Sequence, residues 1–521
     1  MTTITTTIHE IEEHADDLDE EIEADEPNVQ VNFYPPLFLQ RRMWILDVLR
    51  RENIVDVLDV GCGEGQLLSV LAQPAPWLAP PPASVFSSPA RANGEEYMYK
   101  SDLPNLHARR IAGLDISAQD LAFAVKGTEV PGSSKEDDPY PYGVRVTRFE
   151  DLTAKVWKGG LQVINEEFVG VECIVCTEVI EHLPPDILPA LAPMLLGVYH
   201  PTRLLLTTPS YTFNARFTRP NAPRAVRERQ AYPDPTGRTD RIFRHHDHKF
   251  EWTEDEFRAW CHGAADEWGY DIEALGGVGR PLEDDPWGRD EQLGDASFVV
   301  AFRRKEDGKQ DERAERARKA LETLALKGEP HELLAVHEHK AHETARRHPT
   351  PDSVKLIGDA VKAKMESFRE AFISLEQMWF EPEVSTLCGG WIEVLVWAVE
   401  CYDGLNLLKA PNDGTKEWSI ELVGGVEDGP PAMWPEGDSI DLIPENWMPG
   451  QDPEDLSSDE EAVSSTGADG DVSWNGSEVE DPDESWTRHD SDVETWGKGG
   501  GWGDPKQEWG GSEEEPSVLH I

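Results

Sequence analysis

The sequence has few cysteines and no long apolar segment, and each absence excludes a class of protein. Its 521 residues contain six cysteines, too few for a disulfide-stabilised secreted scaffold, so we expect a reducing compartment. The longest apolar run, 391–399, includes Glu393 and is too short to span a membrane. The N-terminal residues lack the basic and apolar regions of a signal peptide. We therefore expect a cytoplasmic protein, with a nuclear fraction as an alternative.

Basic residues are also scarce, and the acidic excess lies mainly at the two ends. The chain has 48 Lys and Arg against 101 Asp and Glu, for a formal net charge of −53. Residues 1–30 carry eleven carboxylates and no Lys or Arg, and residues 411–521 carry thirty carboxylates against four basic side chains. Since only 38% of all residues are hydrophobic, we predict a disordered acidic arm over 1–30 and a disordered tail over 411–521.

The region from 31 to about 305 alternates short apolar runs, typical of buried strands, with helical stretches. That alternation predicts an α/β sheet, and a Pro-rich segment at about 73–105 is interpreted as a surface insertion. The expected strands are VDVLDV (55–60), RIAGLDI (110–116), ECIVCTE (172–178), RLLLTTP (203–209) and ASFVVAF (296–302).

Residues 306–410 are expected to form a helical module. Residues 306–328 are charged and predicted to be helical, and from 352 onward apolar residues recur at steps of three and four, as on one face of a long helix. These positions are Val354, Ile357, Val361, Met365, Phe368, Phe372 and Leu375.

The first chemical motif is a glycine-rich turn after a strand, Val57-Leu58-Asp59-Val60-Gly61-Cys62-Gly63-Glu64-Gly65. Glycines there let the backbone approach a ligand closely, and Asp115 at the end of the next strand could accept hydrogen bonds from ribose hydroxyls. A tight turn without a ligand is the alternative. The pattern D-x-G-x-G-x-G resembles motif I of class I S-adenosylmethionine-dependent methyltransferases, which implies a Rossmann-like fold and that cofactor.

The second motif, Thr177-Glu178-Val179-Ile180-Glu181-His182-Leu183-Pro184, begins at a strand end, where open α/β sheets bind ligands. On a helical turn Glu178, Glu181 and His182 would share one face and form a metal site short of one or more ligands. Solvated surface charges are the alternative interpretation. A further ligand is expected from Arg244-His245-His246-Asp247-His248-Lys249-Phe250-Glu251-Trp252.

Together, in this order, motif I, E-V-I-E-H-L and D-H-K-F-E-W resemble the small-RNA 2′-O-methyltransferase family, which modifies the 3′-terminal nucleotide. The resemblance covers about 33–303 and includes Phe33-Tyr34-Pro35-Pro36-Leu37, Thr208-Pro209-Ser210 with Asn214, and Gly276-Gly277-Val278-Gly279. The chain departs from the family pattern in the Pro-rich insertion and in the pair 209–210, where Pro-Asn is expected.

The resemblance implies which residues form the site. The implied ligands of one divalent metal, Mg²⁺ or Mn²⁺, are also the catalytic set: Glu178, Glu181, His182 and His248. His248 is chosen because it occupies the D-H-K-F-E-W position, with His245 and His246 as alternatives. The implied contacts to S-adenosylmethionine are Asp59, Gly61, Gly63, Asp115, Gly160 and Thr177.

A local reversal of charge precedes His248. Residues 216–249 carry nine Lys or Arg against four acids, which favours contact with RNA phosphates over a solvated loop, the alternative. The candidate RNA-binding residues are Arg216, Arg219, Arg224, Arg227 and Arg229. Cys173 and Cys176, by contrast, lie inside a predicted strand and are expected to be core residues.

These features predict an enzyme that methylates the 2′-hydroxyl of the 3′-terminal nucleotide of small RNAs and so protects that end. A bound divalent ion would stabilise the developing alkoxide. With about 30 residues before the catalytic region, no double-stranded RNA-binding domain is expected there, so we expect a single-stranded substrate and a monomeric enzyme. Glycine-flanked Trp496, Trp502 and Trp509 resemble the Trp-Gly motifs with which disordered proteins bind Argonaute.

Two alternatives from other functional classes stay open. One is a class I methyltransferase acting on another substrate, which would not need the metal ligands. The other is a catalytically inactive scaffold of the same fold that binds Argonaute through its tail.

Overall fold

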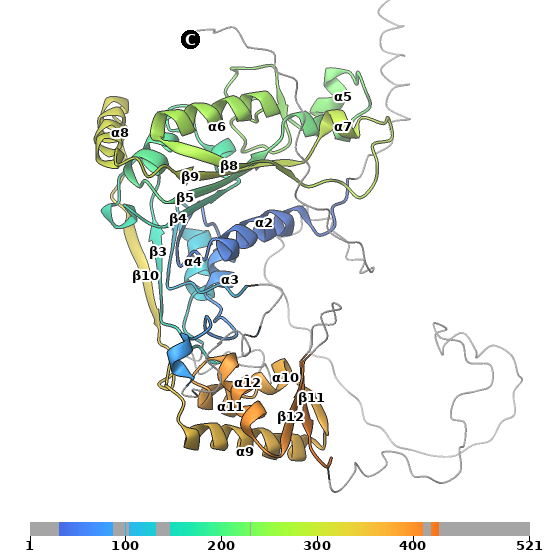
Figure 1. Ribbon diagram of the computed structural model, residues 1–521. Helices are drawn as coiled ribbons and strands as arrows, with labels where there is room; N and C mark the ends of the chain where they lie inside the picture. The colour runs from blue at the N-terminus through green and yellow to red at the C-terminus, as the bar shows by residue number, and fades with distance from the viewer. Residues whose placement is uncertain are drawn as a thin grey trace, which may run out of the picture. The chain divides into compact units, whose positions relative to one another are not determined.

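The computed structural model describes residues 31–86, 99, 104–131, 146–229, 231–409 and 418–426. Its largest element is an eight-stranded sheet with the strand order β10-β3-β2-β1-β4-β5-β9-β8 (Figure 1). The strands are β1 (Asp56–Val60), β2 (Arg110–Asp115), β3 (Leu152–Lys158), β4 (Cys173–Thr177), β5 (Arg203–Pro209), β8 (Tyr270–Val278), β9 (Ser297–Arg304) and β10 (Glu332–His339).

The pairing of these strands is that of a Rossmann-like methyltransferase sheet, which confirms the predicted fold class. Strands β3, β2, β1, β4 and β5 are parallel, and β9, β8 and β10 are antiparallel to their neighbours. Strand β1 lies between β2 and β4, where the strand order reverses, and ligands bind at the carboxyl ends of strands at such a point.

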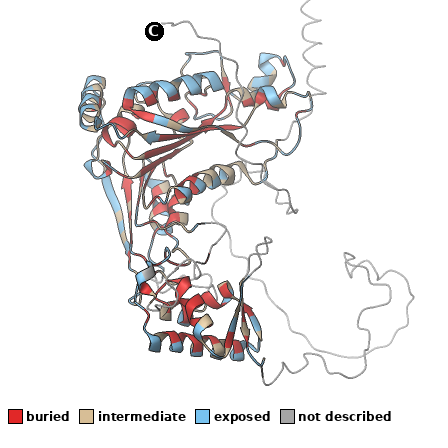
Figure 2. Ribbon diagram, in the orientation of Figure 1, coloured by how far each residue is buried: buried red, intermediate tan, exposed pale blue. Residues whose placement is uncertain are grey.

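Helices cover both faces of the sheet, and the alternation of side chains along each strand explains why. In β1, Leu58 and Val60 pack into the core under α6, while Val57 packs into the core under α2, α3 and α4. Figure 2 shows the central strands as almost entirely buried. The helices are α2 (Leu37–Arg51), α3 (Gln66–Leu71), α4 (Ala118–Gly127), α5 (Arg224–Glu228), α6 (Glu254–Trp268), α7 (Asp290–Leu293) and α8 (Gln310–Leu324).

The five strands expected from their apolar runs are all present, as β1, β2, β4, β5 and β9. Three strands of the sheet were not expected. Strand β10 lies at the edge of the sheet and, among the described strands, pairs with β3. Charged and polar residues such as Glu332, His337 and Glu338 are tolerated at an edge, so the sequence of this strand resembles that of the charged helix before it. The predicted helix within 306–328 is confirmed as α8.

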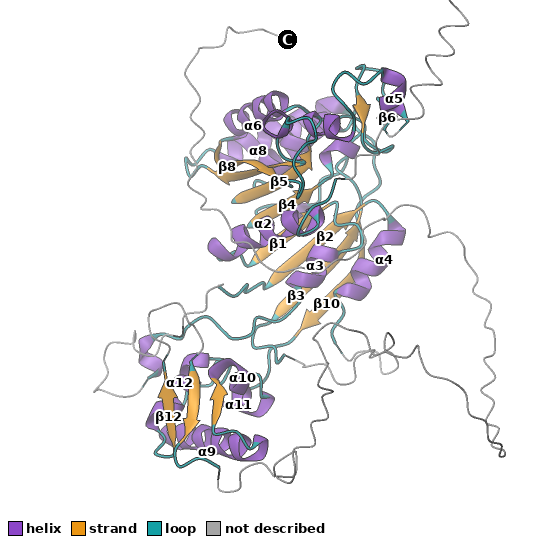
Figure 3. Ribbon diagram, turned by 90° about the vertical axis from the view of Figure 1, so that its right-hand side faces the viewer, coloured by secondary structure: helices purple, strands orange, loops and turns teal. Residues whose placement is uncertain are grey.

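The expectation of a helical module over 306–410 needs correction at its start and in its composition. Helix α8 and strand β10 belong to the large sheet and its covering layer, so the module begins near α9. Beyond its helices, it contains a three-stranded antiparallel sheet, β11-β13-β12 (Figure 3). Its elements are α9 (Pro351–Phe368), β11 (Phe372–Ser374), α10 (Leu375–Trp379), α11 (Pro382–Leu387), α12 (Ile392–Cys401), β12 (Leu405–Leu408) and β13 (Ser419–Leu422).

The predicted long helix ends earlier than its apolar periodicity indicates. Val354, Ile357, Val361 and Met365 are buried along α9 as expected, but Arg369 adopts φ 59° and ends the helix. Phe372 then lies in β11 and is 57% exposed. A left-handed residue breaks the helical repeat although the apolar spacing continues, and periodicity alone cannot detect this.

The boundary drawn at residue 410 is wrong, because β13 follows it and pairs with both β11 and β12. Its Ile420 and Leu422 are buried in the module core. The part of the predicted tail that remains, 427–521, lies outside the described residues, as do 1–30 and the tryptophans Trp496, Trp502 and Trp509.

The Pro-rich segment is more than a surface insertion. Trp77, Leu78, Val85 and Tyr99 are buried in the same core as α9–α12. The indole nitrogen of Trp379 donates to the carbonyl of Pro76 at 2.8 Å. In its described residues the segment forms one short 3₁₀ helix, Ala83–Val85, and it supplies apolar side chains to the module. Within the described residues, no helix is long and apolar enough to cross a membrane.

Candidate active site

The glycine-rich turn joins β1 to α3 and has the conformation that its glycines allow. Gly61 and Gly65 adopt φ 74° and 75°, where a side chain would be strained. A Cβ atom on Gly61 would lie 2.2 Å from Cγ2 of Val179, and one on Gly65 would lie 2.6 Å from Cβ of Ala124. The turn therefore packs directly against the segment that carries the proposed metal ligands.

A cavity of about 310 Å³ opens beside this turn. Four of the six expected cofactor residues line it: Asp59, Gly61, Gly63 and Thr177. The opposite wall comes from α2, through Phe38, Arg41, Arg42 and Ile45. These α2 residues follow the Phe-Tyr-Pro-Pro-Leu motif in the sequence, and no motif indicated a role for them.

The other two expected cofactor residues, Asp115 and Gly160, do not line the cavity. Asp115 accepts hydrogen bonds from the backbone N–H groups of Gly63 at 2.9 Å and Ser117 at 2.8 Å. Gly160 follows β3, and its carbonyl lies 2.9 Å from Nε2 of His331. Burial, together with the charge of Asp115, raises the pKa of Asp59 to about 7, because a carboxylate loses hydration there.

Glu181, His182 and His248 come together as a group that could hold a metal ion. One ligand atom from each lies within 4.8 Å of the others. Glu181 and His182 lie in a short 3₁₀ helix, Ile180–His182, directly after β4, and the backbone N–H of Lys249 donates to the carbonyl of Glu181 at 2.7 Å. That hydrogen bond brings the His248 loop against the end of β4.

Burial shifts the pKa values of Glu181 and His182 toward their neutral forms. Glu181 is fully buried, and Oε2 accepts a hydrogen bond from Thr208 at 2.9 Å, while Oε1 has no hydrogen-bond partner among the other described residues and lies 3.9 Å from Nε2 of His182. Burial, and then the charge of Glu178, raises the pKa of Glu181. Burial and the neighbouring histidines lower the pKa of His182 to about 4, so its imidazole is neutral near pH 7 and can act as a ligand.

His248 is oriented by a residue that the sequence analysis overlooked. Its Nδ1 lies 2.6 Å from Oε1 of the fully buried Glu251. Glu251 also accepts hydrogen bonds from the backbone N–H of Arg244 and from Nδ2 of Asn214. A carboxylate on one imidazole nitrogen leaves the other nitrogen for a metal. Glu251 follows His248 by three positions in the sequence, and this spacing was the available indication that the two side chains interact.

Glu178 is not part of this group in the structure. Its φ of 54° places it before the 3₁₀ helix, so the expectation of one shared helical face for Glu178, Glu181 and His182 is wrong. Its carboxylate lies 2.7 Å from Nη2 of Arg41 and accepts a hydrogen bond from Thr207 at 2.8 Å. Glu178 also lines the cofactor cavity, so it lies between that cavity and the Glu181 group.

The two alternative ligands and one predicted RNA contact lie outside the group of Glu181, His182 and His248. His245 and His246 are exposed and form a separate cluster with Asp247. Arg216 is 3% exposed, pairs with Asp290 at 2.6 Å and donates to the carbonyl of Glu283, so the prediction that it contacts RNA is wrong. Desolvation of a guanidinium is acceptable there because these oxygens compensate its charge.

The remaining candidate RNA-binding arginines lie at the surface, where their contact with RNA stays a prediction. Arg219, Arg224, Arg227 and Arg229 are exposed in or beside α5. Cys173 and Cys176 are buried in β4, which confirms that they are core residues, and burial raises the pKa of both thiols.

Several known proteins are similar to this chain in sequence, although no family model matches it. A small RNA 2′-O-methyltransferase of Arabidopsis thaliana is 28% identical over 272 residues, which are 52% of this chain and 23% of that protein. One from Drosophila melanogaster is 31% identical over 160 residues, 31% of this chain and 36% of that protein. One from Mus musculus is 26% identical over 255 residues, 49% of each protein. The chain thus spans about half, or less, of the length of these relatives.

Solved structures are also similar. A crystal structure of the small RNA methyltransferase HEN1 is 23% identical, with a TM-score of 0.37, over 61% of this chain and 30% of that one. The methyltransferase domain of bacterial CtHen1-C is 20% identical, with a TM-score of 0.32, over 51% of this chain and 98% of that one. The sequence comparisons agree with the resemblance first seen in the motifs: over about half of its length, this chain is similar to small RNA 2′-O-methyltransferases.

Proposed function

We propose that this chain transfers a methyl group from S-adenosylmethionine to the 2′-hydroxyl of the 3′-terminal nucleotide of small RNAs and so protects that end. The observation that carries the proposal is the grouping of Glu181, His182 and His248 next to a glycine-lined cavity at the switch point of the sheet. A methyltransferase needs the cavity for its cofactor. A group of metal ligands beside it suits an alcohol nucleophile, which is hardly ionised at neutral pH.

The cofactor would lie in the cavity between the glycine turn and α2. Asp59, Gly61, Gly63 and Thr177 supply its lining, while Asp115 holds the turn through Gly63. Gly160 is retained as a more distant candidate at the end of β3. The positive φ of Gly61 allows close approach of the backbone to the ligand.

The chemistry of Glu181, His182 and His248 fits one divalent ion, Mg²⁺ or Mn²⁺, with Glu178 as a fourth candidate ligand. Oε1 of the buried Glu181 supports this fit, because it has no hydrogen-bond partner among the other described residues and leaving a buried carboxylate oxygen without a hydrogen bond is costly. A bound ion would supply positive charge that stabilises the 2′ oxygen as it loses its proton. Thr208 orients Glu181, Glu251 orients His248, and Arg41 holds Glu178 at the cavity wall.

The RNA strand is proposed to be single-stranded and to pass the exposed arginines of the 219–229 segment. Positive side chains there attract phosphates, and the 2′-hydroxyl distinguishes RNA from DNA at the site itself. We also propose, from the sequence alone, that Trp496, Trp502 and Trp509 bind Argonaute as the carrier of the RNA, and that the enzyme acts as a monomer.

The proposal is tested by incubating the full-length protein with a synthetic single-stranded small RNA and cofactor labelled in its methyl group. We expect label in the RNA and resistance of its 3′ end to periodate, since a methylated ribose has no free vicinal diol. EDTA should abolish the reaction. Transfer to the RNA that survives EDTA would contradict the proposed metal site. No transfer to any RNA would favour a methyltransferase with another substrate or an inactive scaffold.

A further inference from the structure

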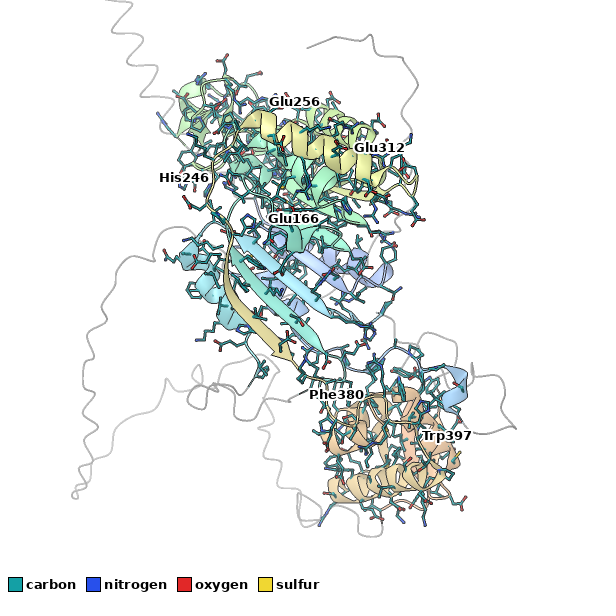
Figure 4. The ribbon with its side chains drawn as sticks, turned by 90° about the vertical axis from the view of Figure 1, so that its left-hand side faces the viewer. Glu166, His246, Glu256, Glu312, Phe380 and Trp397 are labelled. Atoms are coloured by element: carbon teal, nitrogen blue, oxygen red, sulfur yellow. The ribbon has the colours of Figure 1, made fainter. Side chains whose placement is uncertain are left out.

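A row of aromatic rings leads from the proposed metal ligands to the protein surface. The rings of His248 and His245 lie 5.3 Å apart, those of His245 and His246 lie 4.4 Å apart, and those of His246 and Tyr232 lie 5.8 Å apart, between centroids. His248 is buried, whereas the side chains of His246 and Tyr232 are exposed. His246, labelled in Figure 4, lies at the margin of the α/β domain.

The outermost ring is held in place by a small hairpin. Tyr232 lies in β6 (Tyr232–Pro233) and pairs with Phe243 of β7 (Ile242–Phe243), whose side chain is buried. Asp234 accepts hydrogen bonds from the backbone and hydroxyl groups of Thr236 and Thr239, which order the loop of the hairpin. Tyr232 is nevertheless 47% exposed, so burial does not account for this order.

Exposed, ordered rings beside cationic side chains are the usual means of binding single-stranded nucleic acid, because every base has a face that can stack. Arg238 of the same hairpin is exposed, and Arg224 and Arg227 lie in α5, which precedes it. The row also starts at the ligands proposed for the terminal ribose. A base attached close to that ribose would therefore meet His245 and His246 first.

We infer that His245, His246 and Tyr232 form a stacking platform for the bases that precede the 3′-terminal nucleotide; this inference rests on the proposed function. The competing use of the same residues is a second cation site, because ligand atoms of His245, His246 and Asp247 also lie within 4.8 Å of one another. The half-exposed Tyr232 favours stacking, since a phenol ring adds nothing to a cation site of that kind.

The test measures binding of a small RNA that carries the fluorescent base 2-aminopurine at the third nucleotide from its 3′ end, the base expected to reach Tyr232, since stacking quenches its emission. With full-length protein we expect strong quenching. Tyr232→Ala should reduce the quenching and raise the Kd at least about fivefold, which corresponds to about 1 kcal/mol. Tyr232→Phe should retain both. Phe368→Ala, which removes an exposed ring on the C-terminal module, serves as the control.

A second RNA, abasic at the same third nucleotide, should bind wild type and Tyr232→Ala equally. Equal quenching by wild type and Tyr232→Ala would overturn the platform even if methylation were normal. If RNA binding is unchanged in Tyr232→Ala while Asp247→Asn lowers the number of bound Mn²⁺ ions, the cluster is a cation site and the platform is likewise rejected. Failure of the proposed function would appear differently, as quenching without methyl transfer.

Discussion

Glu181 combines full burial, one hydrogen-bonded oxygen and one free oxygen, so it should be the most sensitive residue of the proposed metal site. We expect Glu181→Gln to lower methyl transfer by more than about 100-fold. Residues that only orient a metal ligand cost up to about 100-fold when they are replaced, and a ligand itself should cost more. Calorimetry with S-adenosylmethionine should show nearly unchanged binding, because Glu181 does not line the cavity. Glu254→Gln, on the exposed first turn of α6, is the matched control. Wild-type turnover of the Gln variant at saturating metal would disprove the ligand assignment.

Glu251 should matter although it touches no substrate, because it fixes the ring of His248 through a contact of 2.6 Å. We expect Glu251→Gln to weaken Mn²⁺ binding by about 10- to 100-fold and to leave RNA affinity unchanged. Titration with Mn²⁺ in the absence of RNA measures the effect directly. If metal affinity stayed at the wild-type value, His248 would need no orienting carboxylate and its role as a ligand would lose support.

At the scale of elements, α12 carries a carboxylate that destabilises the folded module at neutral pH. Glu393 is 1% exposed, and its carboxylate oxygens have no partner in other described residues. Burial raises the pKa of Glu393 to about 7. Because the folded state binds the proton more tightly, the stability should be highest below about pH 4.5 and fall by about 3 kcal/mol as the pH rises to about 7.

Denaturant unfolding of wild type and Glu393→Gln across this pH range tests the prediction. The Gln variant should lose the fall in stability between about pH 4.5 and 7 that Glu393 contributes. Glu366→Gln, half exposed near the end of α9, should retain it. An identical pH profile for wild type and Glu393→Gln would mean that the carboxylate is not desolvated in the folded protein.

Helix α5 is the element on which the proposed RNA path depends. Arg224 and Arg227 are exposed there, and among the described residues Arg224 pairs with Glu228 one turn away on the surface. Replacing both with Ala should raise the KM for RNA and reduce the slope of log K against log salt by up to about 1.4, or about 0.7 for each lost phosphate contact. The kcat at saturating RNA should change little. A salt slope equal to that of the wild type would place the strand elsewhere.

At the scale of the whole molecule, residues 470–521 are proposed to bind a partner and to take no part in catalysis. Deleting them should leave methylation of free RNA unchanged, because the cavity and the Glu181 group belong to the α/β domain. Capture of purified Argonaute in a pull-down should weaken, since several spaced Trp anchors gain avidity. Equal capture by full-length and truncated protein would reject the Argonaute proposal.

Several features of the protein could be determined from the sequence alone. Buried parallel strands are nearly continuous apolar runs, so β1, β2, β4, β5 and β9 were identifiable without a structure. The glycine turn was equally clear, because positive φ angles need glycine. The metal-capable residues were also identified, since carboxylate and imidazole groups beside a strand end form a local pattern.

Only the tertiary structure decided which of these residues meet. The hydrogen bond from Lys249 to Glu181 brings His248, and not His245 or His246, to the group, while Arg41 of α2 holds Glu178 outside it. Arg216 and the buried residues of the Pro-rich segment likewise find partners far away in the sequence. Such pairings depend on which groups are desolvated next to one another when the chain folds. Local periodicity and composition do not contain this information.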